Sequence, residues 1–355
     1  MSKFAKAVMY TSHGGPEVLR LVDREVPAPG AGQVLVRIVV SGINPTDWKN
    51  RQASSGTKTA ETVPHQDGAG FVEAVGDDVE GFEVGERVWV VLAAYGNPRG
   101  GTAQEYAAVA ADRVFRLPDE ASFDQGASVG IPGLTAYRAL TVCEGWPSRL
   151  YPGALDGMTV LVAGGAGAVG HAAIQLAKWA GAYVIATVSS AEKERLALAA
   201  GAEYGLRYND PGLARRIREA APAGVDLVVE VAATVNSALD LAVLADRGTI
   251  AIYGNDRGGP FNVNFGRSVS LNLRYQFVLL YTVGSNVISA GAEGINAAFA
   301  ASALPIGADA GLPLHRFALS DTAQAQLAVE RGAIGKVLVD VTSPSALPAY
   351  RPPQD

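Results

Sequence analysis

Six residues near the middle of the chain, Gly165-Ala166-Gly167-Ala168-Val169-Gly170, have the spacing GxGxxG. They follow the apolar run MTVLVA and precede an apolar-periodic segment without proline, which predicts a strand, a tight turn and a helix. Glycine at such a turn lets a pyrophosphate approach the backbone, and the following helix offers it free N–H groups and a partial positive charge. The motif therefore predicts dinucleotide binding; a plain tight turn is the alternative.

The end of the next predicted strand bears on which dinucleotide is bound. A fold that prefers NAD usually places Asp or Glu about 20 residues after the glycines, where it holds the ribose 2′-OH. This chain has Val188-Ser189-Ser190 there instead. A carboxylate would repel a 2′-phosphate, whereas Ser189, Ser190 and Lys193 offer hydrogen-bond donors and one positive charge. These residues predict NADPH; the alternative is that Lys193 only solvates the helix beginning near Ala191.

Other catalytic chemistries lack their residues. The motifs HExxH and GxSxG are absent, which argues against a metalloprotease and a hydrolase. The single cysteine, Cys143, cannot form an internal disulfide or a multi-thiolate zinc cluster, and it fits a reducing compartment. The four histidines are scattered along the chain: His13, His65, His171 and His315. His171 begins the helix after the glycine turn, and we expect a packing or solvent-facing role for it.

Two patterns of predicted elements surround these residues. From Lys6 to about Phe115, short β-rich runs alternate with turn residues, which favours antiparallel sheet. From Gly157 strands alternate with helices, which predicts a parallel sheet; GTIAIYG and LNLRYQF extend it to six strands. A helix near 294–303 and a strand KVLVDV follow. The fold class is therefore α/β, with a doubly wound Rossmann sheet and a second, β-rich part.

Composition sets the broad class of protein. The chain has 355 residues, enough for two domains, with 48% hydrophobic and 18% charged residues, as in a well-buried globular protein. Its net charge is −6, from 29 basic and 35 acidic residues, so nucleic acid and anionic membranes are disfavoured as partners. No apolar stretch approaches 18 residues and the start lacks a signal-peptide core, so we expect a cytoplasmic protein. The tail 343–355, with four prolines, is predicted to be disordered.

Several segments occur in an order typical of one superfamily. They are Gly42-Ile43-Asn44-Pro45-Thr46-Asp47, Asp67-Gly68-Ala69-Gly70 running into VEAVG, LPDEASFDQGASVGIPGLTAYRAL from Leu117, AGGAGAVG from Ala163, and Val229-Glu230 to Asn236. With them the chain resembles the zinc-independent quinone oxidoreductases of the medium-chain dehydrogenase/reductase superfamily, most closely the zeta-crystallin-like branch. This resemblance implies a GroES-like catalytic domain at 1–127 and 284–342, and a Rossmann NADPH-binding domain at 128–283.

The resemblance also implies roles for individual residues. Asn44 and Thr135 would lie near the nicotinamide, and Trp48 could stack on a flat acceptor, with surface packing as its alternative. The remaining cofactor-binding residues implied are Gly165, Ala166, Gly167, Ala168 and Val169 at the pyrophosphate, Ser189, Lys193 and Tyr208 at the 2′-phosphate and adenosine ribose, and Asn236, Tyr253, Gly254, Asn255, Tyr275, Gln276 and Phe277 along the rest. The alternatives are a loop contact for Asn44, a core aromatic for Tyr208 and sheet packing for Phe277.

The metal is expected to be absent. The zinc alcohol dehydrogenases of the superfamily carry a ligand Cys where this chain has Asn44, and a ligand His where Gln66 falls. Amides are poor zinc ligands, so we expect hydride delivery from NADPH to an acceptor that is already electrophilic, a quinone or an enone. The alternatives are an enone or enal double-bond reductase in a biosynthetic pathway, and an NADPH-binding protein without turnover.

The oligomeric state follows from the last predicted sheet strand. The segment from Leu271 to Phe277 alternates apolar and polar residues and runs into FVLLY. An exposed sheet edge of this kind is a hazard that pairing with a second copy removes. We therefore expect a homodimer.

Overall fold

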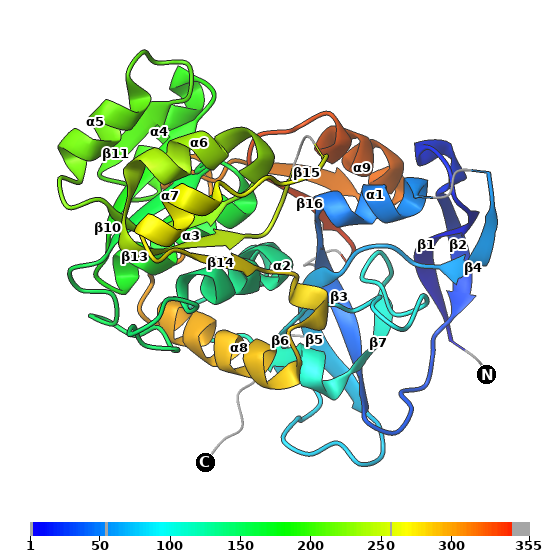
Figure 1. Cartoon of the computed structure of the whole chain (residues 1–355). Coiled ribbons are helices and arrows are strands. Elements are labelled where there is room, and N and C mark those ends of the chain that lie inside the picture. The colour runs from blue at the N-terminus through cyan, green and yellow to red at the C-terminus, as the bar shows by residue number, and fades with distance from the viewer. Residues whose placement is uncertain (1–2, 54–55, 256–257, 343–355) are drawn as a thin grey trace. The chain divides into compact units, whose positions relative to one another are not determined.

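The computed structural model describes residues 3–53, 56–255 and 258–342. The chain forms two compact units, Met1–Ile131 with Leu314–Asp355, and Pro132–Pro313, and Figure 1 shows the elements of each. The tail 343–355, for which disorder is predicted, lies outside the described residues.

The second unit is built on a six-stranded parallel sheet in the order β11-β10-β9-β12-β13-β14. This is the doubly wound order, with its switch point between β9 and β12, and it confirms the predicted Rossmann sheet. The strands are β9 (Thr159–Ala163), β10 (Tyr183–Val188), β11 (Tyr204–Arg207), β12 (Val225–Glu230), β13 (Leu244–Ile252) and β14 (Arg274–Phe277). The helices are α3 (Ala168–Trp179), α4 (Ala191–Ala199), α5 (Leu213–Ala220), α6 (Ala233–Val243), α7 (Phe265–Ser270) and α8 (Ser285–Ala300).

Continuous apolar runs form the central strands of this sheet because both of its faces are covered. In β9, Val160, Leu161 and Val162 are all buried, and β12 buries Leu227 and Val228 in the same way. Helices α3 and α4 pack on β9, β10 and β11, and α6 packs on β12 and β13. Burial on both faces of a parallel sheet calls for such runs instead of alternation.

The first unit is β-rich, as predicted. A three-stranded sheet has the order β2-β1-β4, and a seven-stranded sheet has the order β15-β16-β3-β5-β6-β8 with β7 on β3. The strands are β1 (Phe4–Ser12), β2 (Arg20–Glu25), β3 (Gln33–Ile43), β4 (Lys58–Thr62), β5 (Asp67–Val75), β6 (Arg87–Val90), β7 (Tyr106–Ala110), β8 (Val114–Arg116), β15 (Leu314–Ala318) and β16 (Lys336–Asp340). The helices are α1 (Pro45–Gln52) and α9 (Thr322–Glu330), and α2 (Phe123–Leu140) crosses the boundary between the units.

The boundaries between the units differ from those expected from the sequence. The structure divides after residues 131 and 313, whereas the sequence analysis places the divisions after 127 and 283. The second difference arises because α8, expected only over 294–303, begins at Ser285 and packs inside the second unit. A Cβ on Gly294 would lie 2.3 Å from the ring of Tyr137, so α8 lies directly against the end of α2 there.

Over the parts of the chain that the structure describes, no helix combines the length and the apolar character needed to cross a bilayer.

Candidate functional site

The glycine motif forms the turn between β9 and α3, as predicted. Gly164 and Gly165 donate their N–H groups to Thr187 O of the neighbouring strand β10, at 2.9 and 3.1 Å. Gly167 is the N-cap of α3 and offers no side-chain hydrogen bond to the first helical turn. The N–H groups there are therefore available to an anion, and the helix dipole favours negative charge at this end.

The glycines of this turn have different surroundings. A Cβ on Gly165 would lie 2.7 Å from Ala186 Cβ, and one on Gly170 would lie 2.3 Å from Gly164 O, so both positions exclude side chains by close packing. At Gly167 the nearest atom is Gly164 O at 3.4 Å, an ordinary contact. The space at Gly167 is thus left open by the protein itself.

The predicted adenosine end lies where β10 and β11 finish. Ser190 is the N-cap of α4, and its Oγ accepts from the Lys193 backbone N–H at 3.2 Å. Ser189 is exposed, and Tyr208, 43% exposed, donates its backbone N–H to Val188 O at 3.0 Å. These four residues therefore share the carboxyl edge of the sheet. Ser190 already caps a helix, which leaves Ser189 and Lys193 as the freer candidates for a phosphate.

A pair of buried carboxyl groups lies at the end of β12, the other side of the switch point. Glu230 is fully buried and bonds to the backbone N–H of Ala232, and Asn236 Nδ2 donates to both of its carboxylate oxygens, at 3.1 and 3.2 Å. Asp240 on α6 is 2% exposed and hydrogen-bonds to Glu230. Burial, and then the neighbouring Glu230 charge, raise the pKa of Asp240 well above its usual range. Asn236 is thereby fixed next to the switch point.

The remaining predicted cofactor residues divide into two groups. The first follows β13: Asn255 forms an isolated bridge with Ala232, its Oδ1 accepts from Thr234 N at 3.4 Å, and a Cβ on Gly254 would lie 3.0 Å from Val231 O. Tyr253 N donates to Glu230 O at 3.0 Å. This group is therefore brought together with Asn236 at the edge of the sheet.

The second group lies on β14, the last strand of the sheet. Tyr275 Oη and Ser268 Oγ are 2.6 Å apart, and Gln276 Nε2 donates to the Phe277 carbonyl at 2.8 Å. Phe277 is 63% exposed, and its ring meets Phe261 edge to face. Tyr275 and Gln276 are thus engaged within the unit, while Phe277 presents an apolar surface.

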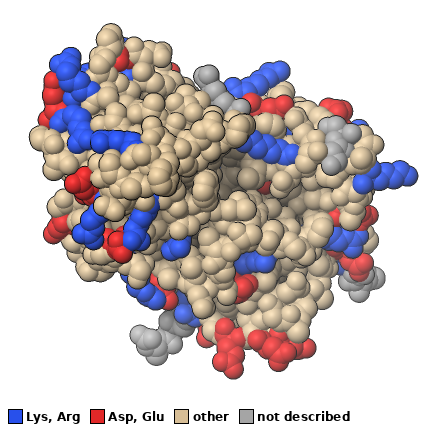
Figure 2. Space-filling model, viewed as in Figure 1, with Lys and Arg blue, Asp and Glu red and all other residues tan. Residues whose placement is uncertain are grey.

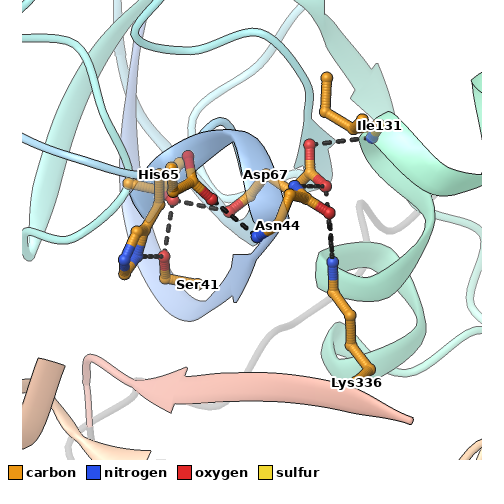
Figure 3. A network of polar contacts seen from close by, with 8 residues as sticks. Ser41, Asn44, His65, Asp67, Ile131 and Lys336 are labelled. Carbon is orange, nitrogen blue, oxygen red and sulfur yellow. Dashed lines mark hydrogen bonds and ion pairs between the residues drawn. The ribbon is translucent and has the colours of Figure 1, made fainter. Parts of the chain in front are cut away.

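In the first unit, Asn44 belongs to a buried polar network that Figure 3 shows from close by. Asn44 Nδ2 donates to Asp67 Oδ2 at 2.6 Å, and Lys336 Nζ donates to Asn44 Oδ1 at 2.9 Å. Asp67 Oδ1 accepts from the Ile131 N–H at 2.9 Å, and Lys336 Nζ lies 3.7 Å from Asp67 Oδ2. All three polar side chains are buried, so each satisfies the others.

Burial and charge act in opposite directions on the ionisable members of this network. Burial raises the pKa of Asp67, and the Lys336 ammonium and the Asn44 hydrogen bond oppose that rise. Burial lowers the pKa of Lys336, and Asp67 and Asp47 oppose that fall. Burial raises the pKa of Asp47 to about 7, although its Oδ2 accepts from Asn44 N at 2.7 Å. The two aspartates and one lysine thus form a coupled cluster around Asn44.

A directed chain of hydrogen bonds continues from this network. Arg51 Nε donates to Gln326 Oε1 at 2.7 Å, so the amide nitrogen of Gln326 faces His65 Nε2 at 3.2 Å. His65 then carries its proton on Nδ1 and donates to Ser41 Oγ at 2.9 Å. Burial lowers the pKa of His65 to about 3, so the ring is neutral. The chain continues through Thr102 to the carbonyl of Asp67.

The two other residues for which a catalytic role is implied lie in different units. Thr135 is buried on α2 in the second unit. Trp48 is half-buried on α1 in the first, with the Lys49 ammonium 5.7 Å from its ring centre. Among the described residues Trp48 Nε1 has no hydrogen-bond partner.

His171 has a structural role, which is one of the two roles expected for it. It is 2% exposed, and its Nε2 bonds to the Ala310 carbonyl at 2.8 Å. Burial lowers the pKa of His171 to about 4, so the ring is neutral. It holds α3 to the segment before residue 311 instead of facing solvent.

The side chains at the positions where zinc relatives carry ligands are engaged within the protein. Gln66 is buried and its Oε1 accepts from Ala94 N at 3.2 Å, while both amide atoms of Asn44 are bonded within the network. Within residues 3–53, 56–255 and 258–342, no group of three or more His, Cys, Asp or Glu side chains is placed to hold a metal ion.

A doubly wound sheet with a glycine turn at its switch point is the architecture of dinucleotide-binding enzymes. Comparison with known proteins agrees with this. Residues 30–119 match the family model "Alcohol dehydrogenase GroES-like domain", and residues 168–293 match "Zinc-binding dehydrogenase".

Relatives and solved structures narrow the class. The chain is 34% identical to human quinone oxidoreductase over 71% of this chain and 74% of that protein. It is 36% identical to the quinone oxidoreductase of Pseudomonas aeruginosa over 74% of this chain and 77% of that protein. The structure of Escherichia coli quinone oxidoreductase complexed with NADPH superposes with a TM-score of 0.78 at 26% identity, covering 95% of this chain and all of that one. The chain therefore belongs to the quinone oxidoreductase family of the medium-chain dehydrogenase/reductase superfamily.

Sequence reasoning assigned no role to several residues of these two sites. Asp67 lies in a segment that carries the resemblance, yet its carboxylate received no function, and Lys336, Asp47 and Asp240 were not singled out. A lysine that opens a strongly apolar strand, as Lys336 opens KVLVDV, is the signal that points to a buried cation.

Proposed function

We propose that this protein transfers a hydride from NADPH to a quinone or similar conjugated carbonyl acceptor without using a metal ion. Its family and NADPH dependence make it an oxidoreductase, while the acceptor and the metal-free chemistry are our proposal. The observation that supports it most is the carboxyl edge of the six-stranded sheet. There an uncapped helix follows the glycine turn, and serines stand where NAD-preferring folds place a carboxylate.

The protein's own contribution would be positioning. NADPH supplies the hydride when bound. Gly165 to Val169 would hold its pyrophosphate, Ser189, Lys193 and Tyr208 its 2′-phosphate and adenosine ribose, and Asn236 with the residues of β13 and β14 the remainder. Asn44 and Thr135 would contact the nicotinamide and Trp48 the acceptor, so that orientation and exclusion of water favour transfer.

The proposal that no metal is used is supported by the hydrogen bonds that the side chains at the zinc-ligand positions already make. Asn44 and Gln66, at the positions where zinc relatives carry ligands, are bonded to neighbouring groups. A polyanionic partner such as nucleic acid is disfavoured by the net charge of −6. On the face in Figure 2, Lys and Arg side chains stand in separate groups, with Asp and Glu side chains and uncharged surface between them.

The first test is turnover with a panel of acceptors. We expect purified protein to oxidise NADPH, followed at 340 nm, when quinones are added, and to do so equally before and after exhaustive chelation. Metal content is measured on the same samples. Turnover with enones or enals alone would replace the quinone assignment by the double-bond reductase. Stoichiometric zinc whose removal abolishes turnover would contradict the metal-free mechanism, and no turnover with any acceptor would leave a binding protein.

We also propose that the protein is a homodimer formed along β14. This strand pairs only with β13 among the described strands, and exposed apolar side chains surround it: Phe265 at 78%, Phe277 at 63%, Leu279 at 58% and Val269 at 55%. Such an edge favours pairing with a second copy.

Light scattering at micromolar concentration tests the dimer. We expect twice the chain mass of 36.7 kDa, and we expect Leu279→Asp to give the mass of one chain because a carboxylate cannot be buried unpaired. The control is Leu198→Asp, at an exposed leucine on α4, near the opposite edge of the same sheet, which should leave the dimer intact. A wild-type monomer would refute the proposal.

A further inference from the structure

Lys336 is a lysine with almost no access to solvent. It opens β16, its relative exposure is 1%, and its Nζ bonds to Asn44 Oδ1 at 2.9 Å and lies 3.7 Å from Asp67 Oδ2. Lysines are almost never fully buried unless they are paired, because removing the ammonium from water is costly. The ammonium of Lys336 is therefore stabilised in the interior by Asn44 and Asp67.

The surrounding backbone is shaped around these side chains. A Cβ on Gly130 would lie 2.4 Å from Asp67 Oδ1, and one on Gly42 would lie 1.9 Å from Ala127 O and 3.2 Å from Lys336 Cε. Glycine at 130 thus makes room for the carboxylate, and glycine at 42 lets the α2 backbone approach β3 beside the stem of the lysine. Gly130 lies on α2 just before Ile131, whose N–H donates to Asp67. The cluster is built into four elements, β3, β5, α2 and β16.

The two charges on either side of Asn44 fix which way its amide points. Its oxygen faces the ammonium and its nitrogen faces the carboxylate. A reversed amide would place an N–H group against Lys336 at 2.9 Å and an oxygen against Asp67 at 2.6 Å, and both contacts would be repulsive. If only Lys336 or only Asp67 were present, the reversed Asn44 amide would make one repulsive contact instead of two.

We propose that Lys336 is a positioning residue that locks the Asn44 amide in one orientation, with Oδ1 toward Lys336 and Nδ2 toward Asp67. Among the described residues only Asp67 accepts from Nδ2, so the second N–H of this nitrogen is left for another acceptor. The consequence for turnover rests on the function proposed above, in which Asn44 contacts the nicotinamide. Lys336 acts on that contact through Asn44 and does not touch the reacting atoms.

The orientation itself is measured without turnover. We would label asparagine with 15N and record the side-chain amide signals of cofactor-free protein, assigning Asn44 from the signal lost in Asn44→Gln. In the wild type we expect one of the two proton signals to lie downfield of ordinary asparagine amides, because this proton bonds a carboxylate at 2.6 Å in a fixed amide. In Lys336→Met we expect the downfield signal to move toward the ordinary asparagine range, because an amide that samples both orientations loses this bond part of the time. In Lys336→Arg, which keeps a cationic donor, we expect it to stay downfield.

Arg51→Met is the matched control for loss of a buried cation. Arg51 is also fully buried in the first unit, but its described contacts are with Gly14, Gln326 and Glu330. Both Met variants should lower stability, because each leaves groups unpaired. Only Lys336→Met should disturb the Asn44 signals. Only Lys336→Met should lower kcat, by about tenfold, with the KM for NADPH unchanged, since a misplaced contact affects the transfer step.

The outcomes separate this proposal from the proposed function. Unchanged Asn44 signals in folded Lys336→Met overturn the proposal whatever the activity, and moved signals with an unchanged kcat overturn the positioning role in turnover. If the wild type reduces no acceptor, the proposed function fails while the amide signals still decide the orientation. If Lys336→Met does not fold, Asp67→Asn with Lys336→Met removes both buried charges together. Both Asn44 proton signals are then expected in the ordinary asparagine range in that double variant, and a signal that stays downfield overturns the proposal.

Discussion

Replacing Gly167 by Val is expected to abolish NADPH binding while the protein stays folded. The backbone at Gly167 has φ −81° and ψ 162°, an extended conformation that suits a β-branched residue, and the nearest atom to an added Cβ is 3.4 Å away. The branched side chain would instead occupy the space in front of the uncapped α3 N-terminus. We expect the Kd for NADPH to rise at least about a hundredfold, or about 2.8 kcal/mol. Calorimetric titration measures it.

The control for Gly167→Val lies in the same turn. A Cβ at Gly170 meets Gly164 O at 2.3 Å, so Gly170→Ala should damage the fold itself and lower the thermal midpoint. Gly167→Val should cost only about 1 kcal/mol of stability, as expected for a less suitable N-cap residue. A folded Gly167→Val variant with wild-type NADPH affinity would show that the motif is only a tight turn.

Replacing Lys193 by Ala is expected to weaken NADPH selectively. Lys193 lies in the first turn of α4, beside Ser189 and Ser190. In the described part of the chain its ammonium has no hydrogen-bond or ion-pair partner, so it remains available for a 2′-phosphate. A charge-assisted contact contributes about 1.5–3 kcal/mol, so the KM for NADPH should rise by about one to two powers of ten. The KM for NADH should hardly change, because NADH lacks the phosphate.

Two comparisons complete this experiment. Added salt should weaken NADPH binding more than NADH binding, because it screens the phosphate contact. Lys178→Ala is the control, since the Lys178 ammonium pairs with Glu203 and should leave both KM values unchanged. If the wild type prefers NADH, or if Lys193→Ala raises both KM values equally, Lys193 is a solvated helix residue and the cofactor assignment is wrong.

The sequence by itself determined the Rossmann sheet and its glycine turn, because both depend on residues close together in the chain. Apolar runs such as MTVLVA, followed by GxGxxG and an apolar-periodic segment, specify strand, turn and helix locally, and the six predicted strands are those of the structure. The β-rich character of the first part followed in the same way from alternation and turn residues.

The extent of each unit was decided by tertiary packing. Helix α8 follows the last Rossmann strand and precedes the last two strands of the first unit, so its position in the chain is compatible with either. Only the close contact of Gly294 with Tyr137, residues far apart in the sequence, assigns it to the second unit. Periodicity predicts that a helix forms, but it does not say which surface the helix covers.

The network around Asn44 was also beyond local patterns. Lys336 and Asn44 are 292 positions apart, and they meet because β16 pairs with β3 in a register that places Leu338 opposite Gly42. In the same way, the sequence cannot distinguish Gly167, which leaves open space, from Gly170, which packs against Gly164 O. Local residue patterns fix secondary structure through propensity and periodicity. Buried polar contacts depend on strand register and on the backbone that approaches from elsewhere, which only the folded chain defines.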